Sequence, residues 1–152
     1  KNYEIFVFSS YIFLKEDDTL YKFNSEKKIF EKFSESVKNM AFLSGSKMAY
    51  SDDNEVKVVY LDRYDQPSEK TDSQLSIGKF SEKITKIFWL NENYLIFSAD
   101  KKTKIAEIDD RDKINVWDLA EFNNPKIFWS PILKKLFIFS EKNLYSLSQL
   151  IP

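Results

Sequence analysis

Paired carboxylates are the side chains in this sequence whose type and spacing best fit a chemical role. There are three Asp pairs, Asp17-Asp18, Asp52-Asp53 and Asp109-Asp110. Pairs of carboxylates serve glycoside hydrolysis and bind hard cations such as Ca²⁺. The first two pairs stand between apolar runs, where Asp stabilises tight turns by bonding its own backbone, so we interpret them as turn residues. Arg111 follows the third pair, and we expect charge-assisted hydrogen bonds between neighbouring structural units there.

The three tryptophans are the second group of candidates. Trp89 and Trp129 follow the same three residues, Lys-Ile-Phe, and an exposed pair of indoles would make a platform for sugar rings. We expect both in the core instead. Trp117 lies in a predicted outer strand between polar neighbours and is the aromatic residue expected to be exposed. The candidate contact residues are therefore Trp117, Asp109, Asp110 and Arg111.

Composition excludes several classes of chemistry. The chain has no His and no Cys, so it can build neither a Ser-His-Asp nor a Cys-His arrangement, and the usual zinc sites are excluded. Gly45 and Gly78 stand alone and cannot form a phosphate-binding glycine loop. We therefore expect no catalytic site, no cofactor and no metal, and a protein that is not an enzyme.

Charge argues against a nucleic-acid partner. Lys and Arg number 23 against 24 Asp and Glu, which leaves no excess positive charge to neutralise phosphates. The lysine pairs Lys27-Lys28, Lys101-Lys102 and Lys134-Lys135 fall in predicted turns among acidic residues. We interpret them as solvated surface and edge protection.

The apolar runs of the chain are short. None approaches the roughly 20 residues that a membrane-spanning helix needs, and the start, KNYEIFVF, is too short and mixed for a signal peptide. We expect no membrane contact by this segment itself. If the natural protein is anchored or exported, the segment responsible lies outside these residues.

Apolar residues occur in runs of four to six or in alternation, with polar clusters between them, which predicts an all-β chain. The chain also repeats itself. Residues 86–89 recur as 126–129, and Ile96-Phe97-Ser98 recurs as Ile138-Phe139-Ser140. Residues 48–63 align without gaps on residues 95–110. These matches indicate one hairpin pattern used several times.

The repeats divide the chain into units 3–33, 37–80, 84–122 and 126–147, each with the length of a four-stranded propeller blade or less. We predict a partial β-propeller of about three and a half antiparallel blades in a single region that is a fragment of a longer chain. The last unit lacks an outer strand, which leaves an edge to be covered. Tyr3–Phe8 could close a small ring, but we favour completion by absent residues or by self-association through the last blade.

Two families share features with these units. The apolar third strand that ends in a large residue plus Asp, as in Ile108-Asp109 and Leu61-Asp62, resembles WD-repeat propellers. The chain departs from that family because it has no Gly-His signal and its Trp117-Asp118 pair falls in the fourth strand of a unit. The resemblance is therefore one of general plan.

The third unit has a closer likeness. Its Trp89 and above all residues 107–119, EIDDRDKINVWDL, are similar to the degenerate propeller repeats that follow a PEGA domain in proteins of small-genome candidate-phylum bacteria. The likeness covers the third and fourth units well and the first two loosely. It implies an extracytoplasmic location, through an N-terminal membrane anchor outside this chain, with a cytoplasmic location as the alternative. It implies no catalytic residue.

Three hypotheses for function follow. The first is a non-catalytic module that binds a protein partner or a surface polymer, in a cell-envelope protein. The second is a carbohydrate-binding or glycan-active domain, which requires at least two carboxylates and an exposed aromatic residue in one pocket. The third is a structural subunit of a homo-oligomeric ring. We expect no pocket of the second kind, and Asp53, Asp109 or Asp110 in a deep cleft beside Trp117 would contradict that expectation.

Overall fold

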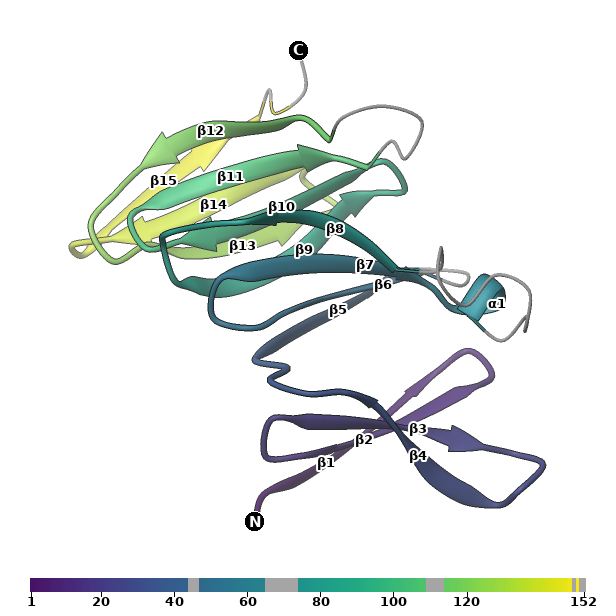
Figure 1. The fold of residues 1–152 in the computed structure, drawn as a ribbon. Helices are drawn as coiled ribbons and strands as arrows, with labels where there is room; N and C mark the ends of the chain where they lie inside the picture. Colours follow the sequence, from purple (N-terminus) through teal and green to yellow (C-terminus); the bar gives the residue numbers. More distant parts are fainter. Residues whose placement is uncertain (44–46, 65–73, 109–113, 149, 151–152) are drawn as a thin grey trace.

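The chain forms four antiparallel sheets in sequence order, as a computed structural model shows for residues 1–43, 47–64, 74–108, 114–148 and 150 (Figure 1). The strands of the first two sheets are β1 (Tyr3–Phe8), β2 (Tyr11–Glu16), β3 (Thr19–Asn24) and β4 (Ile29–Ser34), then β5 (Asn39–Leu43), β6 (Lys47–Ser51), β7 (Glu55–Tyr60) and β8 (Gln74–Lys79). A single helical turn, α1 (Leu61–Tyr64), follows β7.

The third sheet contains β9 (Ile84–Asn91), β10 (Tyr94–Ala99), β11 (Lys102–Glu107) and β12 (Val116–Glu121). The fourth contains β13 (Lys126–Ser130), β14 (Lys135–Ser140) and β15 (Asn143–Leu147). Within each sheet, every strand pairs with its neighbour in sequence. The prediction of an all-β chain of small antiparallel sheets is confirmed.

Turn chemistry explains where the strands end. Asp17 and Asp100 both have a positive φ, 51° and 45°, a conformation that Asp tolerates better than most residues. Asp52 instead accepts hydrogen bonds at its Oδ1 from the backbone N–H groups of Asn54 and Glu55, at 2.8 and 2.6 Å. The interpretation of these Asp pairs as turn residues agrees with these contacts.

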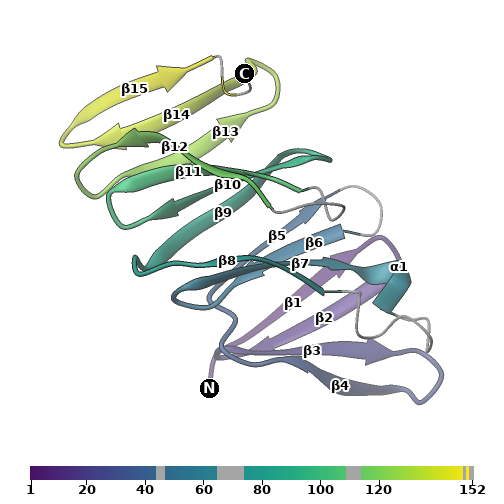
Figure 2. The same ribbon diagram turned by 45° about the horizontal axis from the view of Figure 1, so that its top comes forward.

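The four sheets are stacked from the first to the fourth, and the first and fourth form opposite ends of the stack (Figure 2). Three buried clusters lie between consecutive sheets, and we call these contacts the first, second and third joints. Phe13, Met48 and Tyr50 belong to the first joint. The second joint holds twelve buried residues, Ala49, Val56, Val58, Ile77, Ile84, Ile87, Trp89, Leu95, Phe97, Ala99, Ala106 and Ile108. The third holds six, Ile96, Ile105, Ile127, Leu136, Ile138 and Leu150.

The register of the last hairpin corrects one alignment of the repeats. Ile87 pairs with Phe97 in the third sheet, whereas Ile127 pairs with Ile138 in the fourth. Phe97 and Ile138 both face the preceding sheet, so Ile138 and not Phe139 is the structural equivalent of Phe97. A shift of one residue moves a strand's side chains to the opposite face, which is why Phe139 is exposed.

The first sheet uses β1 as its own inner strand, as expected, because β1 pairs with β2 along its whole length. In the described part of the chain, the fourth sheet has three strands and ends at β15. Leu150, beyond that strand, is buried in the third joint. Among the described residues, no helix has the length and apolar character needed to cross a membrane.

Candidate functional site

Trp117 is the one sequence-predicted contact residue whose position is described. It lies in β12 and is 41% exposed. Asp109, Asp110 and Arg111 lie outside the described residues. A role for these four residues in binding stays a prediction.

The carboxylate next to Trp117 in sequence, that of Asp118, already forms ion pairs with two lysines. Asp118 pairs with Lys102 at 2.9 Å and accepts a hydrogen bond from the largely buried Lys104. The hydrogen bonds from Lys104 and Lys102 hold the pKa of the Asp118 carboxyl below its usual value. Because alternate residues of a strand point to opposite faces, Trp117 and Asp118 do not converge on one site.

Asp53, the other carboxylate of the glycan hypothesis, pairs with Lys83 at 3.3 Å. Neither of the two cavities described below includes Asp53 or Trp117. The condition that would favour a glycan site is not met by these cavities. Nor do the described residues contain a group of three or more Asp and Glu side chains placed to hold a metal ion.

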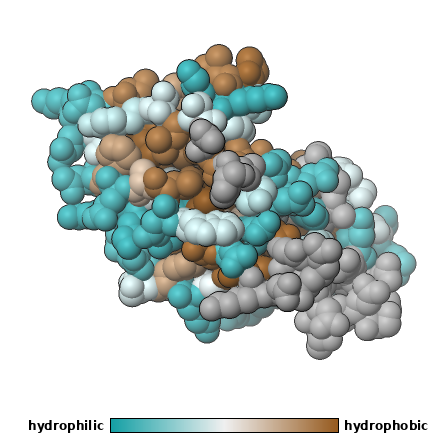
Figure 3. All heavy atoms as spheres, turned by 90° about the horizontal axis from the view of Figure 1, so that it is seen from above, coloured by the Kyte–Doolittle hydropathy of each residue, from teal (hydrophilic) through white to brown (hydrophobic). Residues whose placement is uncertain are grey.

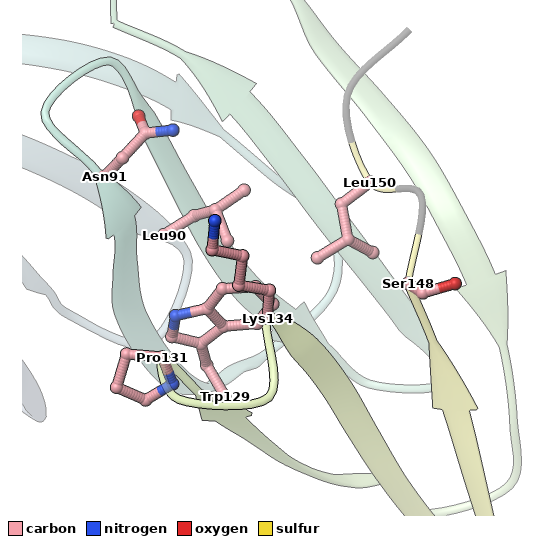
Figure 4. Close-up of a pocket in the computed structure, with 7 residues that line it drawn as sticks. All are labelled: Leu90, Asn91, Trp129, Pro131, Lys134, Ser148 and Leu150. Atoms are coloured by element: carbon pink, nitrogen blue, oxygen red, sulfur yellow. The ribbon is translucent and has the colours of Figure 1, made fainter.

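Both cavities lie at the third joint. The first, which we call the tryptophan cavity, has a volume of about 440 Å³. Its lining residues come from the end of β9, from β13 and the turn after it, and from the segment after β15; they are Leu90, Asn91, Trp129, Pro131, Lys134, Ser148 and Leu150. Figure 4 shows Leu150 on the side of the cavity opposite to Trp129 and Pro131.

The two equivalent indoles differ in their surroundings. Trp89 is buried, and its Nε1 donates a hydrogen bond to the Ala41 carbonyl across the second joint, at 3.1 Å. Trp129 is only partly buried and lines the tryptophan cavity, where its N–H has no hydrogen-bond partner among the described residues. The expectation of core packing is therefore confirmed for Trp89, whereas Trp129 packs against the third joint but is only partly buried.

The tryptophan cavity offers an apolar wall with donor groups, and none of the described residues that line it is acidic. The residues with donor groups are Asn91, Trp129, Lys134 and Ser148. Such a site can hold a planar or apolar group that carries a hydrogen-bond acceptor. Its described lining residues do not include the paired carboxylates that acid–base chemistry of glycosides requires.

The second cavity, which we call the lysine cavity, has a volume of about 580 Å³. It opens where β9 and β13 begin, beside the turn between β10 and β11. Its lining residues are Thr85, Lys86, Asp100, Lys101, Asn124, Pro125, Lys126 and Ile127. Three lysines and one aspartate thus belong to the lining of this cavity.

Sequence reasoning missed both cavities because it treated turn lysines as solvated surface. Lys134 lines one cavity and Lys101 lines the other. A comparison of the turns would have given a signal: residues 99–102 contain two lysines where residues 16–19 and 52–55 are acidic. No comparable signal marked Trp129.

No family model matches this chain, and no curated protein matches it. Solved structures do. Hsv2p of Kluyveromyces lactis matches 95% of this chain and 48% of its own, with 16% identity and a TM-score of 0.63. The yeast Nup82-Nup159-Nup116 nucleoporin complex matches 99% of this chain and 43% of its own, with 13% identity and a TM-score of 0.65.

PorZ of Porphyromonas gingivalis, described as a bacterial surface component of the type-IX secretion system, matches 97% of this chain and 19% of its own. The identity is 10% and the TM-score is 0.59. This chain spans about half the length of Hsv2p and a smaller share of the other two matched chains. At these identities the likeness shows the fold alone. Four successive sheets without ring closure define the class: an open, partial β-propeller.

Proposed function

We propose that this chain is a non-catalytic β-propeller module that binds another protein or a surface polymer. The observation that carries the proposal is the pair of apolar faces at the two ends of the stack. On the first sheet, alternate residues of β1 point away from the second sheet, and Ile5 and Val7 are 67% and 72% exposed. On the fourth sheet, Phe128 and Phe139 are 47% and 42% exposed.

Both end faces expose apolar side chains, as the buried faces between consecutive sheets would if they were separated. Phe128 stacks on Phe137 with ring centroids 5.4 Å apart, and Leu144 is exposed opposite Phe139 in the ladder. Contiguous exposed apolar surface of this kind marks interaction sites in soluble proteins. The side of the molecule seen in Figure 3 also exposes apolar surface between hydrophilic regions. The interaction is therefore assigned to the end faces.

Two further parts of the proposal concern the setting. We place the module in a cell-envelope protein, outside the cytoplasm, which the resemblance to PEGA-associated repeats implies. PorZ, a bacterial surface component, has a similar fold. The Nup82-Nup159-Nup116 complex, a protein assembly, also contains a similar fold, in keeping with a protein partner.

Capture from an envelope extract of the source organism tests this function. The bait is the wild-type chain beside the end-face variants Val7→Glu and Phe139→Glu. Ile132→Glu, at an exposed residue of the turn between β13 and β14, is the control. We expect a partner that the control retains and that at least one end-face variant loses. Equal capture by all four baits would contradict the proposal.

A second candidate function, a ring built from copies of this chain, is favoured by the lengths of the matches. The chain spans 48% of Hsv2p, so two copies have about the length of that one chain. In such a dimer the fourth sheet of each copy would pack on the first sheet of the other. Each of the two contacts would then repeat the face-to-face geometry of the internal joints.

Engineered cysteines can test the ring, because the chain has no Cys of its own. Ile5→Cys and Phe139→Cys chains, mixed and oxidised, should form a disulfide-linked heterodimer. Neither variant alone should cross-link, because the expected contact joins two different faces. Light scattering that shows a stable monomer would exclude the ring and leave binding of a different partner as the function.

A further inference from the structure

The first and second joints are each closed by an ion pair that starts from the same turn. The turn between the second and third strands of one sheet lies against the start of the next sheet. At the first joint, Asp18 in that turn forms an ion pair with Lys38. At the second, Asp53 pairs with Lys83 at 3.3 Å. A turn carboxylate and a lysine of the next sheet thus neutralise each other at both joints.

The same turn of the third sheet has the opposite charge. The ladder pairs Lys15–Leu20, Ser51–Val56 and Ser98–Thr103 enclose turns of four residues, so the three turns align position by position. Residues 16–19 and 52–55 contain three carboxylates each, whereas residues 99–102 contain one carboxylate and two lysines. Lys101 stands where the first turn has Asp18 and the second has Asn54, and Asp100 stands where the second turn has Asp53.

This change leaves the third joint with unpaired positive charge. Lys86, Lys101 and Lys126 all line the lysine cavity, and none of them forms an ion pair among the described residues. The carboxylate in the lining belongs to Asp100, whose Oδ1 accepts a hydrogen bond from the Lys83 backbone N–H at 3.2 Å. One carboxylate against three ammonium groups leaves the cavity with an excess of positive charge.

A row of hydroxyl groups extends from the cavity into the third joint. Thr85, in the lining, shares a hydrogen bond with the buried Ser98, with 2.8 Å between their hydroxyl oxygens. Thr103, opposite Ser98 in the ladder, is fully buried, and its Oγ1 has no hydrogen-bond partner among the described residues. The equivalent residues at the other joints are apolar, Leu20 and Val56. This end of the third joint is therefore polar as well as positively charged.

We propose that the lysine cavity is a binding site for a small oxyanion with two or more negative charges, whose phosphate or carboxylate groups pair with the three lysines of its lining. The cavity of about 580 Å³ is in the size range of small-molecule sites, roughly 300–1,000 Å³. Charge-assisted hydrogen bonds from the three ammonium groups supply the affinity. Pro125 and Ile127 give the site an apolar wall. This site goes beyond the proposed function and does not depend on it.

Titration calorimetry of the wild-type chain at low salt tests the proposal with two probes, inorganic pyrophosphate and citrate. Binding of pyrophosphate alone assigns the site to phosphate groups, binding of citrate alone to carboxylates, and binding of both to oxyanions in general. Each of these results supports the site. If neither probe binds, the proposal is wrong. Affinity should also fall steeply with added salt.

The decisive variant is Lys101→Asp, which recreates the turn charge of the first sheet and offers Lys126 a partner. It should fold at least as well as the wild type and lose measurable binding. Lys126→Gln, which removes one charge-assisted hydrogen bond, should weaken binding by about tenfold. The matched control is Lys28→Asp, the same charge change on an exposed turn of the first sheet. Binding that survives in Lys101→Asp, or that Lys28→Asp weakens equally, would overturn the assignment.

Discussion

The second and third joints have the same backbone plan and differ in how completely side chains fill them. At the second joint, the Trp89 indole is bonded across the joint, and the Asp53–Lys83 ion pair closes the opposite end. At the third, Trp129 and Lys101 occupy the corresponding regions, and each of them lines a cavity. A few substitutions at the rim of a repeated blade can therefore open a cavity between two sheets while the inner strands stay the same.

The largest expected effect tests the register on which this comparison depends. Phe97 is fully buried in the second joint, with its ring centroid 5.0 Å from that of Phe80. We expect Phe97→Ala to lower the free energy of unfolding by about 3–5 kcal/mol. Phe139→Ala, at the position that the sequence repeat aligns with Phe97, should cost about 1 kcal/mol or less, because Phe139 is exposed.

Urea denaturation of both variants, at a protein concentration low enough to exclude association, gives the two values. Ile138→Ala provides the third point. Because Ile138 is fully buried, Ile138→Ala should lower the free energy of unfolding by about 2–5 kcal/mol. A larger loss for Phe139→Ala than for Ile138→Ala would mean that the sequence alignment is correct and the register of β14 is not.

The next largest change in stability is expected when Val and Thr are exchanged between the two joints. Val56 and Thr103 occupy equivalent ladder positions and are both fully buried. Val56→Thr would bury a hydroxyl group in the apolar second joint and should cost about 1–3 kcal/mol. Thr103→Val removes a hydroxyl without a partner and should be neutral or stabilising.

Thermal unfolding of the two variants beside the wild type shows whether Val56→Thr lowers stability while Thr103→Val does not. Because the two side chains have nearly the same shape, cavity formation contributes little to either result. Equal losses in both variants would show that the Thr103 hydroxyl has a favourable contact. The polar character of the third joint would then be structural and would need no ligand.

Substitution of Trp89 and of Trp129 should give a smaller difference in stability. Trp89→Phe removes the hydrogen bond to the Ala41 carbonyl and should cost about 0.5–1.5 kcal/mol for that bond, with a further loss for the smaller ring. Trp129→Phe should change stability less, because the Trp129 N–H has no partner in the described structure. Tryptophan fluorescence offers a second measurement, since Trp89 should be the less accessible of the two to a soluble quencher. Equal quenching would contradict the comparison.

The sequence predicts the fold well because its evidence is local. Alternating apolar residues and the Asp-rich turns set the strands, and repetition of the pattern sets the sheets. The sequence predicts the register between paired strands poorly. Ile138-Phe139-Ser140 matches Ile96-Phe97-Ser98 in letters, but the β9 ladder has irregularities that the β13 ladder lacks, and these decide which face is buried.

The cavities escaped prediction for a different reason. Lys101 and Lys126 are 25 residues apart in sequence, and only the packing of consecutive sheets brings them to one wall. A lysine in a turn is most often solvated, so composition alone does not distinguish a binding group from surface charge. Alignment of the turns by structure makes the distinction, because it shows which position has changed sign.

The smallest effect is a dependence of stability on pH at the second joint. Lys104, largely buried with its ammonium 5.7 Å from the Phe80 ring centroid, forms an ion pair with Asp118. The hydrogen bonds from Lys104 and Lys102 lower the pKa of Asp118 in the folded chain. A carboxyl with a lowered folded pKa contributes stability above its unfolded pKa, near 4, and that contribution is lost as the pH falls through the folded value.

Asp118→Asn should therefore be less stable than the wild type at pH 7, by about 1 kcal/mol or less because the pair is partly exposed and screened. The difference should shrink as the pH falls below about 4, since the wild-type carboxyl then becomes neutral too. Unfolding free energies measured from pH 7 to pH 2.5 check this, and added salt at pH 7 should reduce the difference as well. A difference that stays constant down to pH 2.5 would show that the amide of the variant disturbs packing and that the charge of Asp118 contributes nothing to the joint.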